Sequence, residues 1–358
     1  MPMPSNGDDP STEGYASVDP ARASTVSPRH LLPSPDANLA LDLVRTTEAA
    51  ALGAARWVGR GDKIAADQAA VDAMRFLFNS VHLDGVVVIG EGEKDEAPML
   101  FNGEQIGDGS PPQVDIAVDP LEGTRLTAFG MPSALAVIAL SERGAMFDPG
   151  PCFYMEKIAG GPEIADLLDL DRPLAETLAL IAERKNRDIR DVMVVMLDRE
   201  RHQDAMRQVR EAGARVRLIT DGDVSASLLA VSENSPVDLL WGIGGTPEGV
   251  ISAAAIKCIG GQLLGRLWPR DDDERTAAVR AGYDLDRILT CDDLVAGDDA
   301  FFSATGVTDG DVLEGVRYQG DRGASTESLV MRSRTGTVRR ISARHDRSKM
   351  RAMGISYG

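Results

Sequence analysis

Acidic residues lie at or beyond the carboxyl ends of four predicted strands in this 358-residue sequence. We predict the strands at 86–89, 113–119, 216–219 and 237–241, and the acidic residues are Glu91, Glu93, Asp119, Glu122, Asp221, Asp223 and Glu248. Ligands of open α/β sheets bind beyond the carboxyl ends of the strands. Hard divalent cations such as Mg²⁺ take oxygen ligands, usually a few carboxylates together with water and phosphate oxygens. The pattern therefore predicts a metal site built from carboxylates at one edge of a sheet.

The densest part of this pattern is Asp119-Pro-Leu-Glu-Gly-Thr124. We expect Pro120 to end the strand because it has no N–H to donate, so that the carboxylate of Asp119 projects into the crevice. Gly123 can take a positive φ or let the backbone pass close to a ligand, and Glu122 can then return to the same ion. The hydroxyl of Thr124 would hydrogen-bond a metal-bound water. The alternative is an ordinary acidic turn after a strand.

Glu248 falls in the first turn of a predicted helix, with Thr246 as the expected N-cap and Pro247 as the first helical residue. A carboxylate there can bind a metal ion, or it can be a helix-dipole partner that needs no metal. Residues 242–247 also have the spacing of a dinucleotide-binding loop. We reject that function because Pro247 replaces the third glycine and no single acidic residue stands out at the ribose position.

Phosphate groups need basic side chains or backbone N–H groups at the starts of loops and helices. Arg199 and Arg201 follow the predicted strand 192–197 and lie at the same edge of the sheet as the acidic residues. The alternative for both is a solvated helix start in which they pair with Asp198 and Glu200.

The elements that would hold these residues are typical of an α/β protein. Apolar residues recur at helical spacing from Leu39 to Trp57, and a second helix has apolar residues on one side, namely Val71, Met74, Leu77 and Phe78. From about residue 186 the chain alternates strand, loop and helix, which predicts serial βα units with a parallel sheet. Aromatic residues make up only 4% of the chain, so the core must consist of Ala, Val, Ile and Leu, as in helix-covered sheets.

We predict four regions along the chain. Residues 1–36 form a disordered tail, because Pro, Ser, Asp and Gly are frequent there. Residues 37–185 form a metal-binding α/β lobe, residues 186–341 a substrate-binding α/β lobe, and residues 342–358 a basic tail that is solvated or makes a subunit contact. Two packed lobes are expected because a chain of this length exceeds the size at which one core keeps growing.

The composition argues against several functional classes. With 56 acidic and 38 basic residues the net charge is -18, which repels nucleic acid at long range. The three cysteines, Cys152, Cys258 and Cys291, are too few and too scattered for a disulfide framework or a thiolate metal site. The sequence contains neither an apolar run of ~18 residues nor a secretory signal at its start. We therefore expect a cytoplasmic protein with no membrane segment.

Four motifs together are similar to those of the class II fructose-1,6-bisphosphatases of bacteria. They are Arg60-Gly-Asp-Lys-x-Ala-Ala-Asp67, Val88-Ile-Gly-Glu-Gly-Glu-Lys-Asp-Glu-Ala-Pro98, the segment 119–124 and Gly244-Gly-Thr-Pro-Glu-Gly249. The segment 119–124 also resembles the Asp-Pro-x-Asp-Gly-Thr signature of the wider superfamily of lithium-sensitive, magnesium-dependent sugar and inositol phosphatases, with Glu122 in place of the second Asp. The similarity extends from about Asp42 to Ile341. It implies an α/β fold with α-β-α-β-α layers in two lobes.

The resemblance also implies roles for individual residues. The metal ligands would be Asp67, Glu91, Asp119, Glu122 and Glu248. Thr124 would orient the attacking water with help from Asp67, and Lys63 would be an active-site lysine. The substrate would contact Glu122, Gly123, Thr124, Tyr154, Arg199, Glu200, Arg201, Asp221, Gly222, Asp223 and Gly245. Without the resemblance, Asp67 and Lys63 would be interpreted as solvated residues of a helix start.

The implied activity is hydrolysis of the 1-phosphate of D-fructose 1,6-bisphosphate to fructose 6-phosphate and inorganic phosphate, in gluconeogenesis. Mg²⁺ is the expected cofactor, with Mn²⁺ as a substitute, and a homo-oligomer, either a dimer or a tetramer, is expected. One alternative is the same chemistry on sedoheptulose 1,7-bisphosphate or on an inositol phosphate. A more distant alternative is a non-catalytic sensor of sugar phosphate or metal that keeps the fold.

Overall fold

The structure of the chain, a computed structural model, describes residues 39–92, 99–346 and 348. The predicted tail at 1–36 lies outside these residues, as do Glu93 and the rest of the segment 93–98.

Eight strands of the described chain form one mixed sheet. Its order is β11-β12-β10-β4-β3-β1-β2, with β13 paired to β12. The strands are β1 (Asp84–Ile89), β2 (Gln105–Ile106), β3 (Gln113–Glu122), β4 (Leu135–Glu142), β10 (Phe301–Gly306), β11 (Arg317–Tyr318), β12 (Ala324–Arg332) and β13 (Thr337–His345). Only β1 and β3 run parallel within the described part of this sheet, and the other pairs are antiparallel.

The second sheet has the order β7-β6-β8-β5-β9. Its strands are β5 (Tyr154–Gly160), β6 (Met193–Leu197), β7 (Arg215–Ile219), β8 (Leu239–Gly245) and β9 (Gln262–Trp268). The predicted parallel βα units are confirmed for β6, β7 and β8, because β6 runs parallel to both of its neighbours. The remaining strands depart from the prediction, since β5 is antiparallel to both β8 and β9.

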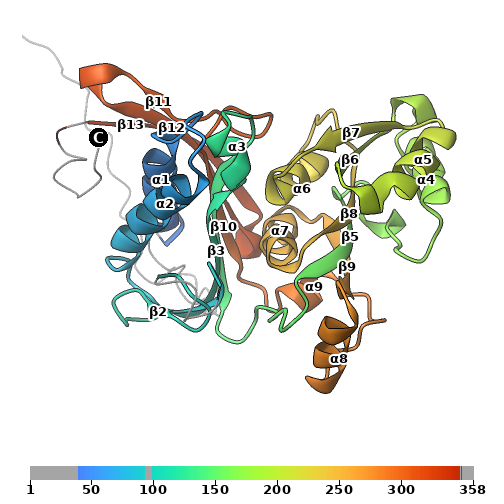
Figure 1. Ribbon diagram of the computed structural model, residues 1–358, viewed down its shortest axis with the longest axis horizontal. Coiled ribbons are helices and arrows are strands. Elements are labelled where there is room, and N and C mark those ends of the chain that lie inside the picture. Colours follow the sequence, from blue (N-terminus) through green and yellow to red (C-terminus); the bar gives the residue numbers. More distant parts are fainter. Residues whose placement is uncertain (1–38, 93–98, 347, 349–358) are drawn as a thin grey trace, which may run out of the picture. The chain divides into compact units, whose positions relative to one another are not determined.

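Helices cover both outer faces and fill the space between the sheets, which gives the predicted α-β-α-β-α layers (Figure 1). The outer pair on the first sheet is α1 (Leu39–Ala55) and α2 (Lys63–Phe78), the middle pair is α6 (Asp223–Val231) and α7 (Thr246–Ile259), and the outer pair on the second sheet is α4 (Leu174–Arg184) and α5 (Gln203–Glu211). Three shorter elements complete the set, α3 (Thr124–Ala128), α8 (Asp272–Arg280) and α9 (Cys291–Leu294). The α/β fold class is confirmed.

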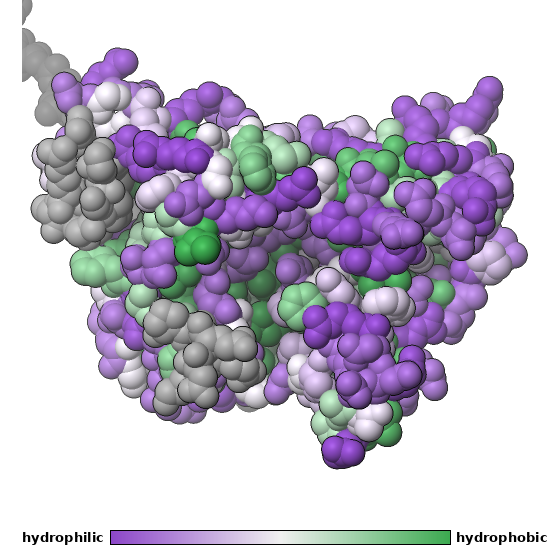
Figure 2. Space-filling view, in the orientation of Figure 1, coloured by the Kyte–Doolittle hydropathy of each residue, from purple (hydrophilic) through white to green (hydrophobic). Residues whose placement is uncertain are grey.

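The sequence of each helix matches its layer. In α7 the run Val250 to Ile256 is buried throughout, because this helix has a sheet on each side. By contrast, α4 buries Leu174, Leu178 and Ile181 on one side only and exposes charged residues on the other. The face of the molecule in Figure 2 is accordingly hydrophilic over α4 and α5.

The predicted boundaries of the regions differ from the division between the sheets. The predicted boundary between residues 185 and 186 does not divide the chain into the two sheets. Strand β5 comes before it but belongs to the second sheet, and strands β10 to β13 come after it but belong to the first. The predicted basic tail is also too long at its start, because residues 342–345 are part of β13 and pair with β12. Strand β13 pairs with β12 at nine residue positions, and this pairing explains why residues 342–345 continue the strand.

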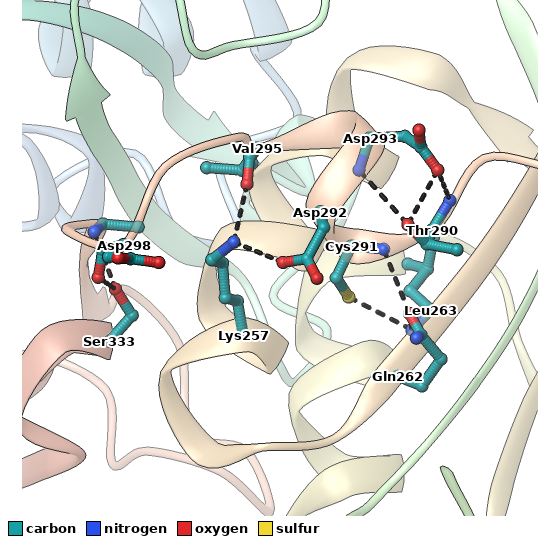
Figure 3. Close-up of polar contacts among 11 residues, drawn as sticks. Lys257, Gln262, Leu263, Thr290, Cys291, Asp292, Asp293, Val295, Asp298 and Ser333 are labelled. Atoms are coloured by element: carbon teal, nitrogen blue, oxygen red, sulfur yellow. Dashed lines mark hydrogen bonds and ion pairs between the residues drawn. The ribbon is translucent and has the colours of Figure 1, made fainter. Parts of the chain in front are cut away.

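Polar contacts hold the short helix α9 beside the end of α7 (Figure 3). The ammonium of Lys257 donates to the carbonyl of Val295 over 3.0 Å and forms an ion pair with Asp292. Oε1 of Gln262 accepts from the backbone N–H of Cys291 and of Leu263, each over 3.0 Å. These contacts fix the start of β9.

None of the helices in the described ranges is long and apolar enough to cross a membrane.

Candidate active site

A cavity of about 510 Å³ opens where the ends of β1, β3, β7 and β8 meet the starts of α3 and α7. The residues that line it include many of the predicted site residues, namely Asp67, Glu91, Asp119, Gly123, Thr124, Asp221 and Glu248. These residues come from segments more than 180 positions apart in the sequence, since Asp67 and Glu248 are both included. The fold therefore brings five of the predicted carboxylates to one cavity, whereas Glu122 and Asp223 are not among the described residues that line it.

Strand β3 does not end at Pro120, contrary to our prediction. It continues to Glu122 through a bulge, in which Asp119 pairs with Val137 and Glu122 pairs with Leu135. The bulge accommodates the missing N–H of Pro120 without ending the strand. Gly123 takes a positive φ, which is one of the two expectations for it, since this residue has φ 86° and precedes the first residue of α3.

Thr124 and Asp67 come together at the junction of α3 and α2. Helix α2 begins at Lys63, and Asp62 caps it by accepting from the N–H of Ala65 over 3.0 Å. Asp67 then lies one turn into the helix, where its Oδ1 accepts from the Thr124 hydroxyl over 3.5 Å. Burial raises the pKa of Asp67, and this hydrogen bond opposes the rise.

The carboxylates of the cavity raise one another's pKa. Burial and the nearby charge of Asp67 raise the pKa of Glu91 to about 8. Burial raises the pKa of Asp119 well above its usual range, and the charges of Glu91, Glu122, Glu248 and Asp67 add to the rise. A site that is unfavourable for several negative charges favours either protons or bound cations.

Glu122 is buried and has one oxygen with a partner and one without. Its Oε1 accepts from the backbone N–H of Val224, at the start of α6, over 3.1 Å. Its Oε2 is buried and makes no hydrogen bond with the described residues. Burial raises the pKa of Glu122 well above its usual range, with Asp221 and Asp223 contributing.

Glu248 lies in the first turn of α7, as predicted, but the predicted cap is wrong. Gly245 occupies the N-cap position, Thr246 is the first helical residue, and Pro247 follows it. A Cβ atom on Gly245 would lie 1.7 Å from Oε2 of Glu248. A side chain at this position would displace the carboxylate of Glu248, so glycine allows the carboxylate to approach the backbone closely. This reason for a glycine differs from that in a dinucleotide-binding loop. This Oε2 is buried and has no hydrogen-bond partner within the described chain.

The comparisons with known proteins agree with these motifs. Residues 37–345 match the sequence family described as bacterial fructose-1,6-bisphosphatase, glpX-encoded. The chain belongs to this family of bacterial fructose-1,6-bisphosphatases. It is 44% identical over 320 residues to fructose-1,6-bisphosphatase 1 class 2 of Escherichia coli (strain K12), covering 86% of this chain and 95% of the relative. It is 42% identical over 345 residues to D-fructose 1,6-bisphosphatase class 2/sedoheptulose 1,7-bisphosphatase of Synechococcus sp. (strain JA-2-3B'a(2-13)), covering 89% of this chain and 99% of the relative.

The carboxylates of this family member have the chemistry of ligands for a divalent cation. The unpartnered oxygens of Glu122 and Glu248 are hard ligands that lack another use within the described chain. However, no three His, Cys, Asp or Glu side chains among the described residues are close enough to form a complete metal cage. A cation that binds to one or two carboxylates and keeps water or phosphate oxygens as its other ligands does not need such a cage.

The predicted basic residues of this family member lie outside the cavity lining. Arg199 donates to the carbonyls of Asp198 and Thr220, over 3.0 and 2.8 Å. Arg201 donates twice to the carbonyl of Ile243 and lies over the ring of Tyr154 at 4.8 Å. Lys63 is exposed, with its ammonium 5.7 Å from the centre of the Phe129 ring.

Two of the other predicted substrate residues lie at the start of α6, and a third lies before α5. Gly222 is the N-cap of α6 and Asp223 its first residue, while Glu200 is exposed at the short turn before α5. A Cβ atom on Gly222 would lie 3.8 Å from Oε2 of Glu122. The Asp221-to-Asp223 turn is therefore adjacent to the carboxylates.

Sequence reasoning missed Lys157, which lies in the middle of β5 and is only 1% exposed. Its ammonium is 2.6 Å from Oδ2 of Asp223 and donates to the carbonyl of Gly245 over 3.2 Å. It also lowers the pKa of Glu248, against the larger effect of burial. The available signal was a lysine directly before the apolar residues Ile158 and Ala159, because a buried charge needs a partner.

Proposed function

We propose that this chain hydrolyses the 1-phosphate of D-fructose 1,6-bisphosphate, releasing fructose 6-phosphate and inorganic phosphate, and that it serves gluconeogenesis. The observation that carries the proposal is the meeting of Asp67, Glu91, Asp119 and Thr124 at one cavity, in a chain 44% identical to a named fructose-1,6-bisphosphatase.

The proposed cofactor is Mg²⁺, with Mn²⁺ as a substitute. Asp67, Glu91, Asp119, Glu122 and Glu248 would hold the ions, and their mutually raised pKa values support this role. Bound divalent cations polarise phosphoryl oxygens, lower the pKa of a bound water and stabilise the leaving oxygen. The five carboxylates without cations would repel a bisphosphate.

The chain's own residues would position the reactants. The Thr124 hydroxyl would orient the attacking water, and Asp67 would accept a hydrogen bond from that hydroxyl. Lys63, at the start of α2, would be an active-site lysine with a catalytic role. The sugar and its second phosphate would contact Tyr154, Arg199, Glu200, Arg201, Gly245 and the turn from Asp221 through Gly222 to Asp223, in addition to Glu122, Gly123 and Thr124.

We also propose that the enzyme acts in the cytoplasm as a homo-oligomer, a dimer or a tetramer. All three cysteines are buried free thiols, which supports a reducing compartment.

Sedoheptulose 1,7-bisphosphate is a second candidate substrate, because the name of the Synechococcus relative includes this activity. Neither relative is named for an inositol phosphate or for a sensor function. A pocket that accepts one ketose bisphosphate can accept another that differs by one hydroxylated carbon.

The test is phosphate release from a substrate panel. Fructose 1,6-bisphosphate, sedoheptulose 1,7-bisphosphate and inositol 1-phosphate are each incubated with Mg²⁺, with Mn²⁺ or with excess chelator. We expect hydrolysis of fructose 1,6-bisphosphate only with a divalent cation, and none by an Asp119→Asn control. Full activity in chelator would refute the metal proposal, and no activity on any bisphosphate would refute the function.

A further inference from the structure

The cavity is lined by carboxylates, but one basic side chain also reaches it. Among its described lining residues, Arg270 is the only lysine or arginine. It lies two positions after the end of β9 and just before α8. A lone guanidinium at the wall of an acidic cavity needs an explanation, because its neighbours favour cations and its own charge favours an anion.

Arg270 is held in place from one side. Its Nε donates to Oε1 of Glu274 over 3.1 Å, and this carboxylate is only 8% exposed. The same Oε1 accepts from the backbone N–H of Phe153 over 3.2 Å. The guanidinium carbon lies 5.0 Å from the centre of the Phe153 ring. The hydrogen bond to Glu274 and the contact with the Phe153 ring therefore restrict the orientation of the Arg270 guanidinium.

The other side of the guanidinium is available. Its two terminal amino groups make no hydrogen bond or ion pair with the described residues. Arg199 and Arg201 differ in this respect, because both use terminal amino groups on backbone carbonyls. The two terminal amino groups of the Arg270 guanidinium can therefore donate side by side to two oxygens of one phosphate.

Arg270 belongs to a continuous row of aromatic and guanidinium groups. Arg201 lies over Tyr154, the rings of Tyr154 and Phe153 are 5.0 Å apart, and Phe153 lies under Arg270. The row connects the predicted sugar-binding residues on β5 with Arg270. It thus places Arg270 beside the proposed substrate position, in the wall of the cavity that the carboxylates also line.

We infer that Arg270 binds the phosphate of the substrate that is not hydrolysed, and so selects for sugar bisphosphates over monophosphates. This inference rests on the proposed function. The carboxylates with their cations would bind the reacting phosphate. Arg270 would join Arg199 and Arg201 at the other phosphate, and it is the one of the three whose terminal amino groups make no hydrogen bond with the described residues. Fructose 6-phosphate, the product, keeps only this second phosphate and is therefore the appropriate probe.

The test compares two competitive inhibitors in the wild-type enzyme and in Arg270→Met. We expect the inhibition constant of fructose 6-phosphate to rise by about 10- to 100-fold, the effect of losing a charge-assisted pair of hydrogen bonds. The inhibition constant of inorganic phosphate, which binds at the reacting position, should change less than about threefold. Arg270→Lys keeps the positive charge but loses the paired amino groups, so its inhibition constant for fructose 6-phosphate should lie between those of wild type and Arg270→Met.

Arg275→Met is the matched control, because Arg275 is exposed on α8 and does not line the cavity. Its constants should equal those of wild type. Unchanged inhibition by fructose 6-phosphate in a folded Arg270→Met enzyme would overturn the inference, and so would an equal loss for both inhibitors. A wild-type chain that hydrolyses no bisphosphate would instead refute the proposed function.

Discussion

The Thr124 hydroxyl donates to Oδ1 of Asp67 over 3.5 Å, although the two residues are 57 positions apart. The same hydroxyl also approaches the carbonyl of Leu121 at 3.2 Å, so it is shared between two acceptors. Both contacts are long for a hydroxyl donor. A water that enters the cavity can therefore compete for this hydroxyl without breaking a strong bond.

Thr124→Ala removes the hydroxyl and leaves every proposed metal ligand in place. If the hydroxyl orients the attacking water, kcat should fall by roughly 10² to 10⁴ while KM and metal affinity change little. The loss of stability should be only about 1 kcal/mol. Thr124→Ser should retain more activity because it keeps the hydroxyl. Steady-state kinetics with circular dichroism on both variants makes the measurement, and kcat of the Ala variant within about threefold of wild type would contradict the role.

Glu122→Gln should separate stability from metal binding. The amide keeps an acceptor for the N–H of Val224 and removes a buried charge close to Asp221 and Asp223. We therefore expect the metal-free variant to melt at a higher temperature than wild type, and its affinity for Mg²⁺ or Mn²⁺ to fall by at least about tenfold. Calorimetric titration of Mn²⁺ and thermal melts with chelator measure the two effects.

Glu176→Gln is a control for that experiment, because Glu176 is an exposed residue of α4. It should change neither the metal affinity nor the melting temperature. An unaltered Mn²⁺ affinity in Glu122→Gln would exclude Glu122 from the metal ligands.

Lys157→Met leaves Asp223 buried without its ion-pair partner. Removing one member of a buried pair costs about 3 to 5 kcal/mol, so the free energy of unfolding should fall by that amount. The double variant Lys157→Met/Asp223→Asn should recover most of the stability, since neither charge remains. We expect the double variant to stay poorly active, because Lys157 no longer links Asp223, at the start of α6, to the carbonyl of Gly245. Denaturant unfolding and kcat/KM test this, and a double variant with wild-type kcat/KM would show that Lys157 only balances charge.

Glu48 provides a pH test far from the cavity. It is buried on α1, accepts from the hydroxyl of Thr326 over 3.3 Å, and has Arg45 and His345 as its charged and titratable neighbours. Burial raises the pKa of Glu48 to about 7. The folded state therefore binds a proton more tightly than the unfolded state, and wild type should lose stability as pH rises through the window from 4.5 to about 7.

Glu48→Gln removes this loss and keeps both neighbours. The variant's advantage in free energy of unfolding should be near zero at pH 4 and rise through the same window to about 1 to 3 kcal/mol, then stay constant. Urea unfolding of both proteins at pH 4, 5, 6, 7 and 8 measures the difference. A difference that does not vary with pH would mean that the pKa of Glu48 is the same in the folded and unfolded states.

The sequence by itself determined the local features of the site. Period-3.6 and short apolar runs predicted α1, α2, β1 and β6, because these patterns depend on residues a few positions apart. The acidic residues at strand ends and the segment 119–124 identified the carboxylates that the fold places at one cavity. The positive φ of Gly123 also followed from the residue type.

Only the tertiary structure decided which distant segments pair. The return of β10 to β13 to the first sheet and the continuation of β3 past Pro120 depend on partner strands that no local pattern specifies. The same holds for the partners of buried charges. Lys157 meets Asp223, and Arg270 reaches the cavity with Glu274 behind it, because packing brings β5, α6, β9 and α8 together. A charged side chain acquires a defined function only when its surroundings fix its partner and exclude water, and that is a property of the folded chain.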